Sequence, residues 1–139
     1  MPTAGRGPKV IRVVVAEDHP SIRENLRDVL DAERDMICVG VAKDGREALD
    51  VTIEELPDVL IIDAELGDLD GIDVALRLRR LAPAVRTILY GTEPAPEELA
   101  RRAQLACFVA KGAPVDELLI AVRRAAFAAR TQSLRTGAQ

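Results

Sequence analysis

The stretch VLIIDAELGDLDG, residues 59–71, joins a short apolar run directly to a cluster of acidic side chains. The run VLII is typical of a strand covered on both faces, and the glycines among the acids indicate a loop that starts where the strand ends. Like charges a few ångströms apart push one another towards the protonated form, so the cluster needs a counter-charge. The fold therefore depends on what the rest of the chain brings to this strand end. The four acids are Asp63, Glu65, Asp68 and Asp70.

Short apolar runs alternate with stretches of helical spacing five times along the chain, which is typical of βα units on a parallel sheet. Crossovers between parallel strands are right-handed almost without exception, so helices should cover both faces. We therefore expect an α/β fold with a doubly wound parallel sheet. The expected strands are 10–16, 36–42, 58–62, 86–90 and 107–110, and the expected helices follow His19-Pro20, span 46–55, 71–81 and 96–104, and begin after Pro114.

Composition limits the classes of function. With 139 residues the chain has the length of one domain, and 48% hydrophobic but only 2% aromatic residues predict an aliphatic core without stacking platforms. A formal net charge of -4 and a pI near 5.1 argue against binding of nucleic acid or an anionic membrane by this chain alone. Proteins and cations are the expected partners.

The cysteines and the chain ends indicate a cytoplasmic protein. Cys38 and Cys107 lack metal-ligand spacing and His19 is the only histidine, so we expect structural thiols and no ordinary zinc site. No stretch approaches the ~18 apolar residues of a membrane span, and the start lacks the apolar core of a signal peptide. We expect a disordered lead-in at 1–9, one domain at 10–131 and a polar, unpatterned tail at 132–139.

Three carboxylates are candidates for a metal site. The first strand ends in Glu17-Asp18 and the third ends at Asp63. If the strand order is 2-1-3-4-5, these strands are neighbours, and their side chains meet at the sheet edge where ligands bind in such folds. A divalent cation would relieve their repulsion. Hard oxygen ligands that leave room for water favour Mg²⁺.

A lysine follows the fifth strand at the same edge. Lys111 is one of three lysines in a chain with sixteen arginines, and an ammonium there could hold an anion brought to the metal. Acids, a cation and a lysine around one aspartate are the groups that phosphoryl transfer to a carboxylate requires, namely positioning and charge neutralisation.

Three motifs carry a family resemblance: VVVAEDHP at 13–20, DVLIIDAELGDLDG at 58–71 and CFVAKGAPVDEL at 107–118. Each motif alone is weak evidence of family membership, but the three motifs together, at these spacings, are strong evidence. The chain resembles the receiver domain of bacterial two-component response regulators, most similar to the nitrate-regulator class, over roughly residues 10–130. The resemblance implies a flavodoxin-like (βα)₅ fold with strand order 2-1-3-4-5.

The resemblance also implies roles for residues. Asp63 would accept a phosphoryl group from a sensor histidine kinase, and Lys111 would pair with that group. Glu17 and Asp18 would bind Mg²⁺ directly or through water, with Asp63 and the backbone carbonyl of Glu65 as further ligands. Such a domain is no enzyme beyond phosphorylating and dephosphorylating itself.

The sequence departs from the family pattern after the fourth strand, where a serine or threonine is expected. By length that position is Gly91, with Thr92 one residue later, and both remain candidates. Phe108 matches the aromatic switch residue, although it could also be a core residue. Leu66-Gly67 replaces the usual Met-Pro. We expect a working phosphoacceptor with an atypical output loop.

The other polar residues near these motifs have plainer interpretations. Asp70 fits the N-cap of the third helix, Asp68 is expected to be solvated, and His19 fits a surface or capping position.

Two enzyme or metal-binding alternatives fit less well. A phosphatase of the haloacid dehalogenase type needs an aspartate two positions after the nucleophile, where this chain has Glu65, and it needs a cap domain. A calcium loop of the EF-hand type follows a helix, whereas DAELGD follows a predicted strand.

A stronger alternative is an interaction module that dimerises without phosphorylation. Ile120 and Phe127 lie off the main apolar stripe of the last helix, as expected for a partner surface or a loosely packed core position. A homodimer would use helices one and five, or four and five. Most relatives carry a DNA-binding helix-turn-helix after a linker, for which this chain has no room, so we expect a stand-alone receiver or a fragment of a transcription regulator.

Overall fold

A computed structural model of the chain describes residues 9–137. It contains five strands and five helices in strict alternation. The strands are β1 (Ile11–Ala16), β2 (Met36–Ala42), β3 (Val59–Asp63), β4 (Arg86–Gly91) and β5 (Cys107–Ala110). The helices are α1 (Pro20–Asp31), α2 (Gly45–Glu55), α3 (Gly71–Leu81), α4 (Glu97–Arg102) and α5 (Val115–Gly137).

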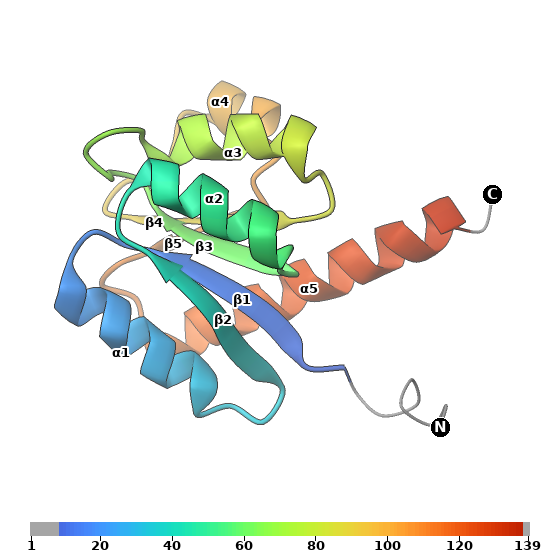
Figure 1. Cartoon of the computed structure of the whole chain (residues 1–139), viewed down its shortest axis with the longest axis horizontal. Helices are drawn as coiled ribbons and strands as arrows, with labels where there is room; N and C mark the ends of the chain where they lie inside the picture. Colours follow the sequence, from blue (N-terminus) through green and yellow to red (C-terminus); the bar gives the residue numbers. More distant parts are fainter. Residues whose placement is uncertain (1–8, 138–139) are drawn as a thin grey trace.

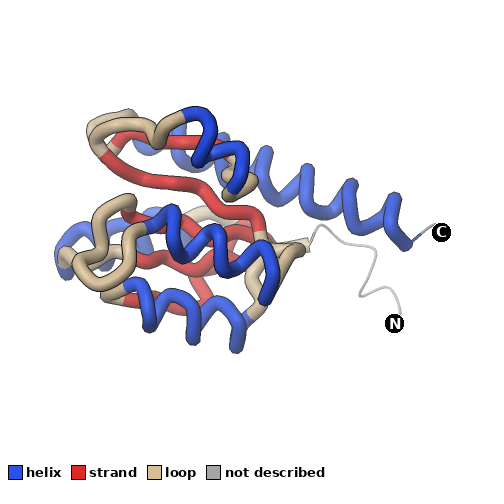
Figure 2. The backbone as a smooth tube through the Cα atoms, turned by 90° about the horizontal axis from the view of Figure 1, so that it is seen from above, coloured by secondary structure: helices blue, strands red, loops and turns tan. Residues whose placement is uncertain are grey.

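The five strands form one parallel sheet in the order β2-β1-β3-β4-β5, which confirms the expected doubly wound fold. Helices α1 and α5 cover one face of the sheet, and α2, α3 and α4 cover the other (Figure 1). Seen from above, helices overlie the strands, and the long helix that ends at the C-terminus extends past them (Figure 2). β3 therefore lies in the middle of the sheet with β1 and β4 beside it, which places the end of the VLII run at the centre of one edge.

The core is aliphatic, as the composition predicts, and it is split by the sheet. Every residue of β3 is buried, because its side chains alternate between the two helical layers. Val59 and Ile61 pack with α1 and α5, whereas Leu60 and Ile62 pack with α2 and α3. This burial on both faces holds the end of β3 in place.

Three strands differ from their expected bounds by one residue, and the helices α2 and α4 differ for identifiable reasons. α2 begins at Gly45 rather than at residue 46, since Asp44 caps it by accepting a hydrogen bond from the Glu47 amide. α4 is shorter than 96–104, because Pro96 precedes its first turn and Gln104 adopts a positive φ of 52° that a helix does not allow.

Residues 132–137 of the expected polar tail continue α5. A 23-residue helix is roughly 35 Å long, longer than the strands, so α5 extends beyond the sheet (Figure 1). The alanines at 125, 126, 128 and 129 that precede this polar stretch are strong helix formers. Residues 138–139, and all of the expected lead-in except Lys9, lie outside the described residues.

Cys38 and Cys107 are free, half-buried thiols. Burial raises the pKa of each thiol, which disfavours the reactive thiolate. None of the helices within residues 9–137 combines the length and the hydropathy that crossing a bilayer requires.

Candidate functional site

The acidic residues that follow β3 separate into different roles in the structure. Asp63 is 3% exposed, whereas Glu65, Asp68 and Asp70 are exposed. Asp70 caps α3 by accepting a hydrogen bond from the Asp73 amide, which confirms its predicted role. Asp68 is exposed but not merely solvated, since its carboxylate accepts hydrogen bonds from the amides of Gly45 and Arg46 at the start of α2.

Backbone contacts hold the loop between Asp63 and α3. Leu66 is buried and anchors the loop, while Gly67 has a φ of 87°, a conformation that favours glycine. The amide of Gly71 donates to the carbonyl of Ala64 at 3.0 Å. A Cβ on Gly71 would lie 2.6 Å from the Asp63 carbonyl oxygen, so only glycine lets α3 start this close to the strand end.

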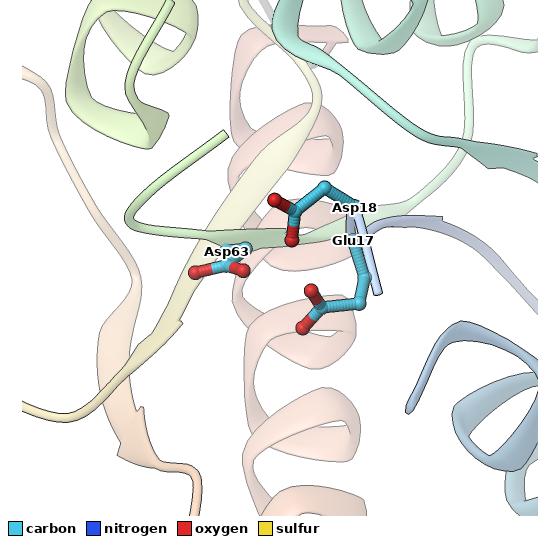
Figure 3. A group of neighbouring side chains, drawn as sticks. All are labelled: Glu17, Asp18 and Asp63. Carbon is cyan, nitrogen blue, oxygen red and sulfur yellow. The ribbon is translucent and has the colours of Figure 1, made fainter. Parts of the chain in front are cut away.

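Glu17 and Asp18 reach the same edge from the end of β1. The amide of Glu17 donates to the carbonyl of Ala42 on β2, and the amide of His19 donates to the Glu17 carboxylate at 3.1 Å. The side chain of Glu17 is turned inward and the residue is 1% exposed, whereas Asp18 is exposed. The carboxylates of Glu17, Asp18 and Asp63 gather around a common space (Figure 3).

Lys111 links two of these acids from the end of β5. Its ammonium donates to Oδ2 of Asp63 at 2.9 Å and lies 3.1 Å from Oε1 of Glu17. Its backbone amide donates to the Gly91 carbonyl, so the position of Lys111 is set by the pairing of β5 with β4. The other Asp63 oxygen, Oδ1, accepts a hydrogen bond from the Glu65 amide at 3.0 Å.

The proton affinities of Glu17 and Lys111 reflect this crowding. Burial, and after it a hydrogen bond shared with Asp63 that favours the protonated form, together raise the pKa of Glu17 to about 7. Burial alone would lower the pKa of Lys111, but its bonds to Asp63 and Glu17 outweigh that effect and raise it. The ammonium therefore stays charged at neutral pH, while Glu17 is close to its titration midpoint.

The donor set fits a hard divalent cation. The carboxylate oxygens of Glu17, Asp18 and Asp63 come within 4.8 Å of one another, a spread that one ion can bridge directly or through water. Oε1 of Glu17 is buried and has no aligned hydrogen-bond donor among the described residues, although the Lys111 ammonium is near. A buried carboxylate oxygen left in this condition is stabilised by a cation or by water bound to it.

A cavity of about 300 Å³ opens beside Asp63 and Lys111. Gly91, the last residue of β4, and the exposed Thr92 both line it. A Cβ on Gly91 would lie 3.2 Å from the Ala64 Cβ and 3.7 Å from the Phe108 ring. Phe108 is half-buried against the core that α2 and α3 share, and it lines a different hollow, next to α5.

Two residues of the site were not singled out from the sequence. The Tyr90 ring centroid lies 5.8 Å from the Lys111 ammonium, and Glu93 lines the cavity. Burial raises the pKa of Tyr90, which keeps the phenol neutral. Their positions in the sequence could have indicated both residues, because each lies within two residues of Gly91 at the carboxyl end of β4.

A five-stranded doubly wound sheet with this acid and lysine arrangement defines the receiver class of signalling domains. The response regulator receiver domain family matches residues 13–123, and the chain belongs to it. The chain is similar to the probable transcriptional regulatory protein NarL of Mycobacterium tuberculosis, with 34% identity over 83% of this chain and 54% of that protein. It is also 30% identical to the uncharacterized transcriptional regulatory protein YxjL of Bacillus subtilis, over 84% of this chain and 54% of that protein.

Solved structures give the same result. The response regulator domain of Thermotoga maritima CheB matches with a TM-score of 0.78 and 34% identity, over 85% of this chain and 97% of that domain. The receiver domain of Mycobacterium tuberculosis NarL matches with a TM-score of 0.76 and 32% identity, over 86% of this chain and 98% of that domain. The chain thus matches isolated receiver domains nearly end to end, but it spans about half or less of the length of the curated relatives.

Proposed function

We propose that this chain accepts a phosphoryl group on Asp63 from a phosphohistidine of a sensor histidine kinase, in a Mg²⁺-dependent reaction, and relays the signal to a protein interface or an attached output domain. The observation that carries this proposal is the buried Asp63 carboxylate, paired with Lys111 at 2.9 Å and adjoining a cavity of about 300 Å³. General phosphoryl acceptance is the function of the family to which the chain belongs.

The reaction is a transfer between two side chains. An oxygen of the Asp63 carboxylate attacks phosphorus, the P–O bond forms as the P–N bond breaks, and the electron pair leaves on the imidazole nitrogen. Hydrolysis restores the free Asp63 carboxylate, because water attacks the phosphorus of the acyl phosphate and releases inorganic phosphate. Such transfers depend on positioning and charge neutralisation, which are the tasks that the site residues perform.

The observed position of each site residue allows a specific role in this transfer. The Glu65 amide fixes one oxygen of Asp63, and the Lys111 ammonium can follow negative charge from the carboxylate to the phosphoryl group. Glu17, Asp18, Asp63 and the backbone carbonyl of Glu65 would hold Mg²⁺. When bound, this ion supplies positive charge that offsets the phosphoryl oxygens.

The readout of phosphorylation should be weak if Gly91 is the switch position. A complete switch from 1:99 to 99:1 needs about 5.5 kcal/mol of differential stabilisation. A hydrogen bond from a hydroxyl to a charged oxygen contributes roughly 1.5–3 kcal/mol, and Gly91 cannot make one. Thr92 lines the same cavity and is the alternative donor, while Phe108 on β5 would carry the change towards α5.

We propose regulation of transcription as the output, because similar proteins have this role in their names. NarL and YxjL are named as transcriptional regulatory proteins, and this chain spans about half of each. A DNA-binding domain attached to this receiver would give it the same kind of output in the cytoplasm.

Acetyl phosphate and beryllofluoride test the proposal. With Mg²⁺, acetyl phosphate should add the mass of one phosphoryl group, and peptide mapping should place it on Asp63. Asp63→Asn should abolish the addition, whereas Asp70→Asn, which changes a nearby exposed acid, should not. An unmodified wild-type protein, or modification that persists in Asp63→Asn, contradicts the proposal.

A second candidate function is dimerisation that does not depend on phosphorylation. Phe127 is 72% exposed and Ile120 is 47% exposed, and Ile120 lines a hollow of about 640 Å³ between β5 and α5. Large apolar side chains exposed on one helix often mark a partner surface. Sedimentation with and without beryllofluoride separates the two functions, because a dimer that ignores the phosphate mimic favours the interaction module.

A further inference from the structure

Helix α3 has a second face that the core does not use. Its inner face is buried, but Leu76, Arg77, Arg80 and Leu81 project to the other side, and Leu81 is 58% exposed. Residues three and four apart are neighbours on a helix, so these two leucines and two arginines form one continuous surface.

The neighbouring helix α4 turns this face into a groove. Arg102, the last residue of α4, completes a hollow of about 650 Å³ with the four α3 residues. The Arg79 guanidinium donates a hydrogen bond to the Arg102 carbonyl, which joins the end of α4 to α3 where the two helices lie side by side (Figure 1). The groove is therefore preformed and does not depend on a partner for its shape.

The charge in the groove is unbalanced. Arg77, Arg80 and Arg102 form no ion pair within residues 9–137, whereas Arg12, Arg101 and Arg123 each pair with an acid. No acidic residue lines the hollow. Three guanidinium groups around two leucines are thus left without carboxylates in a chain whose net charge is -4.

We propose that this groove, defined by Leu76, Arg77, Arg80, Leu81 and Arg102, binds an acidic amphipathic segment of a partner protein. An apolar side chain of the segment would sit on the leucines, and flanking carboxylates would accept paired hydrogen bonds from the guanidinium forks. The groove contains no aromatic side chain on which bases could stack, and the acidic chain as a whole repels nucleic acid and anionic lipid.

The groove is separate from the phosphoacceptor site. Gly71, at the start of α3, contacts the Asp63 strand end, and Leu81 lies about ten residues further along, roughly 15 Å away along the helix axis. Binding there goes beyond the proposed function and requires no phosphorylation of Asp63.

The test uses a labelled synthetic peptide as the probe. The peptide is helix-forming and carries glutamate pairs three positions apart around leucines, and its control has lysine in place of each glutamate. Fluorescence anisotropy with the full chain at low ionic strength should show saturable binding of the acidic peptide and none of the basic one. The affinity should fall as salt increases. Backbone NMR shifts should concentrate in α3 and α4.

Matched variants locate the binding surface. Arg77→Glu with Arg80→Glu should weaken binding at least about tenfold, since buried interface arginines dominate such contacts. Arg27→Glu with Arg34→Glu changes two exposed arginines elsewhere and alters the net charge equally, so it should change affinity less than about twofold. Circular dichroism checks that both variants fold, as expected for exposed positions. Asp63→Asn should bind the peptide like wild type, so a failed phosphorylation test leaves this result unaffected.

Several outcomes overturn the proposal. One is the absence of saturable binding by the acidic peptide, and another is equal weakening by the two charge-reversal pairs. A third is tighter, groove-dependent binding of a DNA duplex or of phosphatidylserine vesicles than of the peptide. Self-association that only the Arg77 and Arg80 variants abolish would assign the groove to a second copy of this chain.

Discussion

The ammonium of Lys111 lies 2.9 Å from Oδ2 of Asp63 and 3.1 Å from Oε1 of Glu17, so one cation at the end of β5 contacts acids from two other strand ends. Both carboxylates are almost fully buried, and neither has another positively charged partner among residues 9–128, whose side chains the structure describes. The stability of the site without metal therefore depends on this one side chain.

Lys111→Ala should destabilise the metal-free protein by roughly 2 kcal/mol or more, because it leaves two buried carboxylates without a counter-charge. Urea denaturation near pH 8 in the presence of a chelator measures the loss. Lys43→Ala removes an exposed lysine that forms no ion pair in the described part of the chain and should have little effect. Equal stability of the Lys111 and Lys43 variants would contradict the assigned role of Lys111.

Glu17 should make the stability of the metal-free protein depend on pH. Its pKa is about 7 in the folded chain and 4.5 without the fold, so the folded state binds more protons between these values. Stability from Glu17 is therefore fully present below about pH 4.5 and is lost as pH rises through about 7, by roughly 3 kcal/mol in total.

Glu17→Gln tests that dependence, since an uncharged amide keeps the shape and removes the titration. The difference in unfolding free energy between pH 5 and pH 8 should shrink in the variant, which should also be more stable than wild type near pH 8 without metal. Mg²⁺ should stabilise the wild type more than the variant at that pH. Glu65→Gln, at an exposed acid, serves as the control.

Gly71→Ala should destabilise the protein by about 1–3 kcal/mol, because the new Cβ would lie 2.6 Å from the Asp63 carbonyl oxygen and force α3 away from β3. Thermal unfolding measures the effect, and slower acetyl phosphate labelling of Asp63 should accompany it. Gly112→Ala is a matched control, since a Cβ there meets nothing within 4 Å. If Gly71→Ala were as stable as the wild type, the predicted clash with the Asp63 carbonyl would be contradicted.

Gly91→Ser should strengthen the response to beryllofluoride by placing a hydroxyl at the end of β4. The added Cβ lies 3.2 Å from the Ala64 Cβ, so a small adjustment accompanies it. Amide shifts of Phe108 and its β5 neighbours on adding the phosphate mimic should be larger than in wild type. Gly91→Ala, which adds the Cβ without the hydroxyl, separates the two effects, and Thr92→Val tests the other candidate donor. Equal responses in Gly91→Ser and Gly91→Ala would argue against a missing hydroxyl as the cause.

The fold and most of the site follow from local pattern. The five apolar runs, the N-cap at Asp70 and the ending of α3 before Pro83 are short-range features, because capping and strand burial depend on residues close in sequence. The convergence of Glu17, Asp18 and Asp63 also follows once the strand order is known, since parallel strands share one carboxyl edge.

Other features could not be predicted from local pattern. Asp68 caps a helix that begins 23 residues earlier, and α5 continues through a polar stretch with no apolar stripe to reveal it. Gln104 ends α4 through a left-handed backbone conformation that its side chain does not indicate.

The sequence by itself determined the alternation of strands and helices and the identity of the acids and the lysine, because these depend on neighbouring residues and on residue type. Only the tertiary structure decided that Glu17 is buried with a pKa of about 7, and that Arg77, Arg80 and Arg102 share a groove without acids. Burial, proton affinity and unpaired charge arise from contacts between segments that are distant in sequence, and those contacts exist only in the folded chain.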